Sequence, residues 1–298
     1  MDKLNSILVV VDDVHGGLAV LDKAVRIARC FQARIELMLG DSTQACTFAN
    51  HCTRQGYEEV LLYSFHRGEE PVHDVIVRRV LQQRPDLIVK QSSGPHPLRR
   101  WTLRDNDWRL VQESPAPIML AGARPWTTPL RMAAAVDVSD RDAEAVTRGI
   151  LQSAGFLALG SHAELDILYS ERERRDETLR MQRAVKLAQL VREFYVGSEH
   201  IQILNGLPEQ TLPDIITARR YHLLVLGAVT HRSGVGAMLT NLTGNLVDAA
   251  EGDVVLVKAS RSAGLERVAL RLIADRRSGV ETAAGDSAAL RSTAEGAR

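Results

Sequence analysis

Continuous apolar runs recur along the chain, and they predict strands. Runs such as Leu8–Val11 and Leu223–Leu226 are apolar at every position instead of alternating with polar residues. Strands that are buried on both faces have this pattern, as in parallel sheets covered by helices. Between the runs, apolar residues recur at helical spacing, for example over residues 18–28 and 179–191. This alternation predicts an open, doubly wound α/β sheet.

The same order of elements occurs twice. Ile7–Val11 is followed by Asp12, and Met132–Val136 is followed by Asp137. In each copy a helical stretch, a second strand and a later pair of apolar runs come next. A duplicated unit of about 130 residues is too long for a solenoid repeat and matches the size of a whole domain. The sequence therefore predicts two domains of one kind in one chain.

The domain boundaries follow from the prolines and from the composition of the tail. We expect a first domain over residues 1–124, a linker over 125–130 and a second domain over 131–260. Pro125 and Pro129 prevent either sheet from continuing through the linker. Residues 261–298 are rich in Ala, Arg, Ser, Glu and Gly, which predicts a short helix and then a disordered tail. After its second strand the first copy has only the small, polar stretch 40–56, so its helix there should be short or irregular.

Composition narrows the functional classes. Apolar residues make up 45% of the chain, charged residues 25%, and the formal net charge is zero. A general nucleic-acid binder would carry a basic excess. No apolar run approaches the roughly 20 residues needed to span a bilayer, and the chain enters a strand at once, which predicts no membrane segment and no signal peptide. The odd number of cysteines, three, favours a reducing cytoplasm. Cys30 lies in the first predicted helix, and we expect its side chain to be part of the buried core.

The candidate ligand-binding residues lie at the ends of predicted strands. Ligands of doubly wound sheets bind at the carboxyl ends of the strands, where Asp12 and Asp137 could accept hydrogen bonds from a ribose or an adenine amino group. The alternative, which spacing alone favours, is that each aspartate caps the next helix. The glycine-containing loop after Gly227 could cradle a phosphate with its N–H groups, or it could be a plain connection. The corresponding first-half loop, 91–101, contains two prolines and is a poorer cradle.

Several segments resemble the tandem universal stress protein family, and its E type in particular. They are the strand-one aspartate of each half, Asn106–Val111 followed by Ser114–Pro117, Pro125–Trp126, and Gly206–Glu209 with Ile215–Ile216 and Leu224–Gly227. The resemblance runs from about Ile7 to Lys258. It implies Rossmann-like, adenine nucleotide alpha hydrolase-like domains with five-stranded parallel sheets, packed together through their fifth strands.

The nucleotide-binding members of that family carry a glycine motif after strand four, and this chain matches it only in part. In the second half, Gly227 matches the first glycine, Thr230 and Thr240 replace the other two, and Asn241 replaces the hydroxyl residue, with Asp137 as the acid. In the first half, Asp12 is the acid, and the motif positions are Gln91, Gly94, Arg104 and Asp105. Side chains at glycine positions obstruct the approach of backbone to phosphate, so we expect the first half to be degenerate.

These observations favour a non-catalytic cytoplasmic stress-response protein that binds an unidentified protein or small molecule. The alternative is an ATP-binding switch that uses the second domain alone, and a homodimer of the tandem chain stays open. No metal site or other cofactor is expected. A nucleotide-dependent transferase is disfavoured because the sequence shows neither a carboxylate cluster for a metal nor a Lys/Arg clamp.

Overall fold

The computed structural model describes residues 4–57, 60–64, 71–92, 107, 110–111, 113–138, 142–171, 177–194, 196–228 and 252–258. The first half contains β1 (Ser6–Val11), α1 (Val14–Phe31), β2 (Arg34–Leu39), α2 (Ala45–Arg54), β3 (Val60–Ser64), α3 (Val72–Gln83), β4 (Leu87–Gln91) and β5 (Ile118–Ala121). The second half contains β6 (Arg131–Val136), α5 (Asp142–Ser161), β7 (Glu164–Glu171), α6 (Glu177–Glu193), β8 (Ile201–Asn205), α7 (Pro208–Arg219), β9 (Leu223–Ala228) and β10 (Asp253–Lys258). Short 3-10 turns cover Ser42–Gln44 and Ser198–His200.

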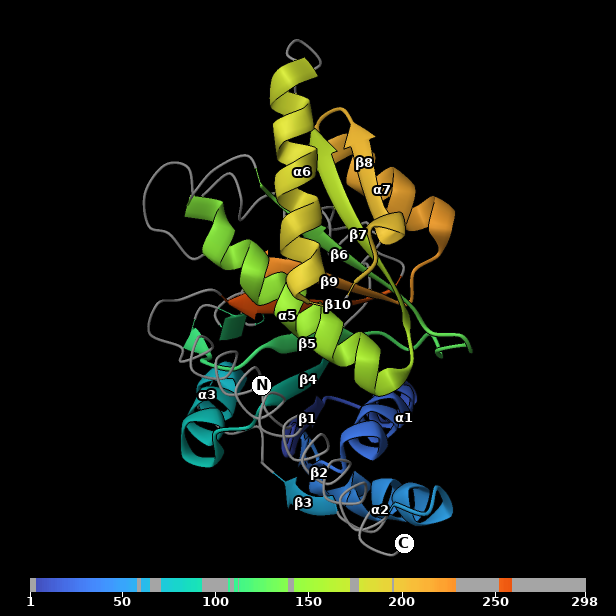
Figure 1. The fold of residues 1–298 in the computed structure, drawn as a ribbon. Coiled ribbons are helices and arrows are strands. Elements are labelled where there is room, and N and C mark those ends of the chain that lie inside the picture. Colours follow the sequence, from blue (N-terminus) through green and yellow to red (C-terminus); the bar gives the residue numbers. More distant parts are fainter. Residues whose placement is uncertain are drawn as a thin grey trace, which may run out of the picture.

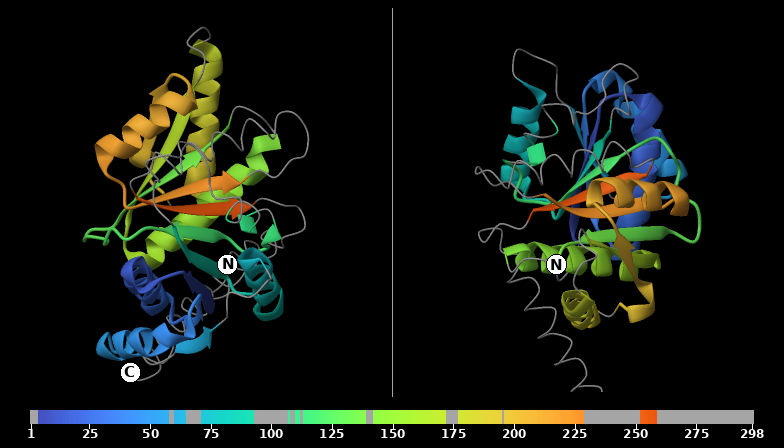
Figure 2. Two further views of the ribbon diagram at one scale, coloured as in Figure 1. Left: turned by 180° about the vertical axis from the view of Figure 1, so that it is seen from behind. Right: turned by 90° about the horizontal axis from the view of Figure 1, so that it is seen from above.

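All ten of these strands form one mostly parallel sheet in the order β3-β2-β1-β4-β5-β10-β9-β6-β7-β8 (Figure 1). Within each half the strands are parallel. The exception is the central pair, where β5 and β10 run antiparallel with Met119 opposite Val255. The two halves therefore meet through their fifth strands, as the family resemblance implied. Helices cover both faces of the sheet, as the view from above shows (Figure 2).

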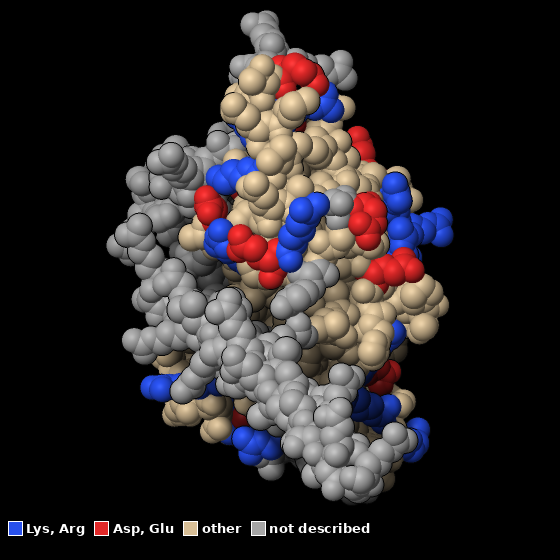
Figure 3. All heavy atoms as spheres, in the orientation of Figure 1, with Lys and Arg blue, Asp and Glu red and all other residues tan. Residues whose placement is uncertain are grey.

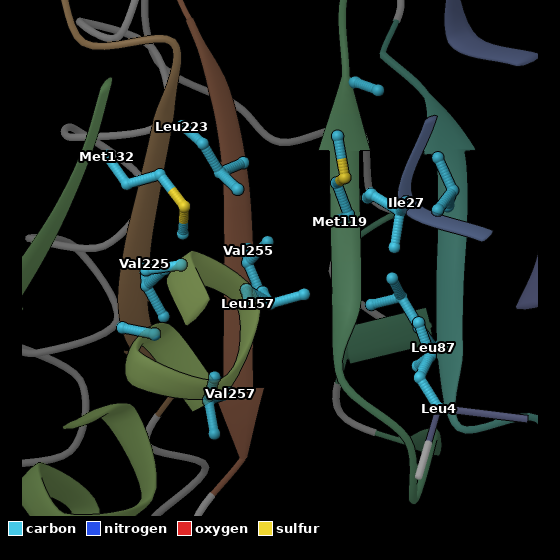
Figure 4. Close-up of a cluster of buried hydrophobic side chains, with 14 of the residues drawn as sticks. Leu4, Ile27, Leu87, Met119, Met132, Leu157, Leu223, Val225, Val255 and Val257 are labelled. Atoms are coloured by element: carbon cyan, nitrogen blue, oxygen red, sulfur yellow. The ribbon is translucent and has the colours of Figure 1, made fainter. Parts of the chain in front are cut away.

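The apolar runs form two buried layers, one on each face of the sheet. Along β1, Val9 belongs to the layer under α1 and α5, while Val10 belongs to the opposite layer under α3 and α7. Successive strand residues point to opposite faces, so a strand covered on both sides must be apolar throughout. Figure 4 shows part of the first layer near the centre of the sheet, including Met119 and Val255.

Helix lengths agree with the expected difference between the halves. In the first half, α2 is a helix of 10 residues preceded by a 3-10 turn, which confirms that this helix is short. In the second half, α6 has 17 residues within the long helical stretch predicted from the sequence. The short helix and the tail predicted for 261–298 lie outside the described residues.

The prediction for Cys30 is wrong, because its side chain is exposed. The buried face of α1 includes Ala24, Ile27 and Ala28, which follow one another at helical spacing. Cys30 comes two residues after Ala28, which places it about 200° around the helix, on the solvent side. The buried cysteine of the first half is Cys52 on α2.

Candidate functional site

The structure brings the strand-one aspartates beside the ends of the fourth strands. β1 lies between β2 and β4, so Asp12 comes next to Gln91, the last residue of β4. In the second half, β6 lies next to β9, which places Asp137 at the same edge of the sheet as Gly227. These two strand edges are where an open parallel sheet would hold a ligand.

In the first half, the Gln91 side chain occupies this position and bonds the strand-one turn. Its carbonyl oxygen accepts the backbone N–H of Asp12 at 3.0 Å and that of Asp13 at 3.4 Å. Its amide nitrogen donates to the Asp13 carboxylate at 3.2 Å. Gln91 is only 7% exposed. The N–H groups at the end of β1, which a ligand would need, are therefore bonded within the chain.

A glycine in α1 makes room for that side chain. A Cβ atom at Gly16 would lie 2.6 Å from the Gln91 amide nitrogen, closer than real Cβ atoms come to such a neighbour. The N–H of Gly16 also donates to the Asp13 carboxylate at 3.1 Å, so Asp13 caps α1. This hydrogen bond is the main reason that the pKa of Asp13 is lowered from its ordinary value. In the first half, the helix cap suggested by spacing is thus Asp13, one residue after Asp12.

Asp12 instead faces a buried lysine. The Lys90 ammonium on β4 lies 2.9 Å from an Asp107 oxygen and 3.7 Å from an Asp12 oxygen. The side chains of Lys90 and Asp107 are both 8% exposed. An ammonium this deeply buried is stable only with paired carboxylates. Asp12 is therefore part of an internal charge cluster in the first half.

The second-half strand edge is built differently. The Asp137 side chain is exposed, while its backbone is held to α5: its N–H donates to the Thr147 hydroxyl at 3.3 Å, and its carbonyl accepts from that hydroxyl at 2.6 Å. At Gly227, a Cβ atom would lie 2.5 Å from the Val146 side chain and 3.1 Å from that of Ile150. Close packing of β9 against α5 thus needs this glycine independently of any ligand.

A further polar cluster lies at the carboxyl end of β7, and the sequence reasoning missed it. Glu171 is 4% exposed and pairs with Arg183 at 3.3 Å and Arg180 at 3.5 Å, both on α6. On the same strand, burial raises the pKa of the Tyr169 hydroxyl; the nearby positive charge of Arg183 partly offsets this shift, while Glu171 and Asp137 add to it. The sequence feature that could have revealed this cluster is the arginine-rich start of α6. That feature is equally typical of a solvent-exposed helix face.

The remaining predicted positions fall outside the described residues. They are Thr230, Thr240 and Asn241 in the second half and Gly94, Arg104 and Asp105 in the first. Within the described ranges, no group of three or more His, Cys, Asp and Glu side chains is arranged to hold a metal ion. No helix in that part of the chain has the length and apolar character required to cross a bilayer.

Comparison with known proteins shows that this chain is similar to universal stress proteins. A universal stress protein E homolog of Haemophilus influenzae is 21% identical over 206 residues, which cover 63% of this chain and 67% of that protein. Universal stress protein E of Salmonella typhi is 20% identical over 62% of this chain and 64% of its own length. No protein-family model matches the chain.

Solved structures agree. A protein assigned as a universal stress protein from Pseudomonas aeruginosa UCBPP-PA14 is 26% identical, with a TM-score of 0.74 over 90% of this chain and 98% of its own. A protein of unknown function from Pseudomonas aeruginosa PAO1 is 25% identical, with a TM-score of 0.73 over 91% of this chain and 98% of its own. The universal stress protein of Archaeoglobus fulgidus shares the fold at 14% identity and a TM-score of 0.62, over 87% of this chain and 98% of its own.

These likenesses confirm the resemblance to the universal stress protein family. Within this family, the curated relatives reported above are of the E type.

Proposed function

We propose that this chain is a non-catalytic stress-response protein of the cytoplasm that acts by binding a small molecule or a partner at the strand edge of its second half. Two doubly wound domains, over residues 1–124 and 131–260, would carry unequal roles. The first would be structural, and the second would bind. Support for the unequal roles comes from the contrast between the two strand edges.

The observation that carries this proposal is the Gln91 side chain. It accepts the N–H groups that follow β1 and donates to Asp13, while Lys90 neutralises Asp12. A ligand entering the first half would have to break these bonds and expose a buried ammonium. At the matched positions the second half has Gly227, which has no side chain, and Asp137, whose side chain is exposed.

A nucleotide-binding switch in the second half is the alternative. It is favoured by Arg180 and Arg183, which Glu171 holds at the end of β7, the strand next to β6. Two guanidinium groups against one carboxylate leave local positive charge that would attract a polyphosphate. Asp137 would then accept from the ribose or the adenine, with Gly227, Thr230, Thr240 and Asn241 near the phosphates.

Calorimetry with ATP and Mg²⁺ separates the two ideas. If the switch is correct, the wild-type chain binds ATP. Asp137→Ala should lose about tenfold or more in affinity, because one hydrogen bond to a charged group contributes about 1.5–3 kcal/mol. The matched Asp12→Ala control should keep the wild-type affinity. No heat at millimolar ATP would eliminate the switch and leave a different ligand or partner. ATP hydrolysis that Asp137→Ala abolishes would overturn the non-catalytic proposal.

The surface beside this edge carries charges of both signs. On the face shown in Figure 3, acidic and basic side chains alternate over α5 and α6. Among the charged side chains of these two helices, Arg148 lies 3.3 Å from Glu144 and 2.5 Å from Glu193, and Lys186 lies 3.1 Å from Glu144. A mixed pattern supports a specific ligand or partner over general attraction to nucleic acid, which needs a basic surface.

A further inference from the structure

One buried ion pair joins the two halves of the chain. The Lys23 ammonium on α1 lies 2.8 Å from each carboxylate oxygen of Asp253, the first residue of β10. Both side chains are 3% exposed. Burial lowers the pKa of Lys23 and raises that of Asp253, and their mutual attraction opposes both shifts. Each charge is therefore tolerable in the interior only with its partner present.

The end of the first half and the linker complete this cluster. The Asp253 carboxylate also accepts the N–H of Gly122 at 2.8 Å and the indole N–H of Trp126 at 2.6 Å. Lys23 donates in turn to the Gly122 carbonyl at 2.7 Å. Every polar group of the cluster thus has a partner from the first half, the linker or the second half.

The two halves meet at the β5–β10 pair, here called the seam. Comparison of the two copies shows that the ion pair occurs on only one side of this seam. Gln32 and His162 both end the first helix of their half in the left-handed conformation, and the next residue donates back to Ala28 or Ala158 at 2.9 Å. By this match, Ser153 is the second-half residue that corresponds to Lys23. Asp253 lies beside Leu223 on β9, and Pro117 lies beside Leu87, the corresponding residue of β4. Pro117 is therefore the first-half residue that corresponds to Asp253.

Pairing of like halves would therefore bury unpaired charges. In a pair of two first halves, each Lys23 would face Pro117, which has no acceptor side chain. In a pair of two second halves, each Asp253 would face Ser153, which has no cation. The apolar residues of the central strand pair do not discriminate in this way, since Met119 on β5 and Val255 on β10 are both apolar (Figure 4).

We infer that the Lys23–Asp253 pair selects the pairing of a first half with a second half and rejects like pairs. The duplicated fold offers two similar apolar edges, and a complementary charge on each edge makes only the mixed pair acceptable. Specificity of this kind comes from the cost that the wrong pairs incur. The selected partner is the other half of the same chain, or the other half of a second copy.

The test uses the full chain with a site-specific protease sequence inserted between the exposed residues Thr127 and Thr128. After folding and cleavage, native mass spectrometry counts mixed and like pairs of halves. The wild-type chain should give mixed pairs only. Lys23→Met with Asp253→Asn removes both charges and should give like pairs as roughly a tenth or more of the total.

Two further variants control for folding and for charge. Lys23→Glu with Asp253→Lys rebuilds the pair with the charges exchanged and should restore mixed pairs only. Arg26→Met removes a cation from the rim of the same seam, where Arg26 lies over the Trp126 ring, and should leave mixed pairs only. Exclusively mixed pairs in the Lys23→Met, Asp253→Asn variant would overturn the inference. Separation of its halves without like pairs would also overturn it, since the ion pair would then supply affinity and not selection.

Discussion

At the scale of single residues, Gln91 distinguishes the first half from the second. A glutamine at the end of a buried strand has both a donor and an acceptor, and here both are used: the acceptor by Asp12 and Asp13, the donor by Asp13. Glycine at the matched position of the second half leaves α5 free to pack against β9. One substitution thus separates a closed strand edge from one that could hold a ligand.

Replacement of Gln91 by leucine should lower the free energy of unfolding by about 1–3 kcal/mol, because the partly buried N–H groups after β1 would lose their acceptor. Urea denaturation measures this change. Gln83→Leu is the control, since Gln83 is exposed at the end of α3 and should change stability by about 0.5 kcal/mol or less. Equal stability of the Gln91→Leu variant and the wild type would contradict the role given to this side chain.

At the scale of elements, His222 fastens the linker to the start of the second-half sheet. Its Nδ1 accepts the N–H of Arg131 at 3.0 Å, and its Nε2 lies 2.7 Å from the Thr127 hydroxyl. Burial and the neighbouring Arg124, Arg131 and Arg26 lower the pKa of His222 from its usual value of 6.5, with hydrogen bonding to Arg131 acting in the opposite direction. The neutral ring is therefore the form that joins these elements.

This lowered pKa predicts a dependence of stability on pH. Below pH 6.5 the unfolded chain binds a proton at His222 before the folded chain does, so this contribution to stability is present above pH 6.5 and is lost as the pH falls. His222→Gln should flatten the stability profile between about pH 7 and 5. The exposed His15 provides the control, His15→Gln, which should keep the wild-type slope. An unchanged slope in the His222 variant would exclude this explanation.

At the scale of the whole molecule, the two halves are joined by one continuous sheet and by the packing of one helix from each half. α1 and α5 pack across the seam, where the rings of Phe31 and Phe156 stack at 4.6 Å between centroids. Gly160 permits this approach, because a Cβ atom there would overlap the Phe31 ring. With β5 paired to β10 beneath these helices, we expect the halves to unfold together.

Phe156→Ala removes one ring of that stack, which should cost about 1–3 kcal/mol for a partly buried aromatic side chain. Differential scanning calorimetry should show one transition for the wild-type chain and, for the variant, a Tm lower by about 2–10 °C, with broadening as the halves lose their coupling. Leu159 lies on the same helix and is 64% exposed, so Leu159→Ala should leave the transition in place. Equal Tm values for the two variants would show that the stack does not couple the halves.

The sequence by itself determined the strands, their parallel character and the duplication, because burial on both faces demands apolar residues at every strand position, as in Leu8–Val11. It also placed Asp12 and Asp137 at strand ends. Only the tertiary structure decided what surrounds them. The bond from Asp12 to Gln91 spans 79 residues, and the Lys23–Asp253 pair spans 230. Polar contacts between distant segments depend on which strands become neighbours, and no local pattern records this.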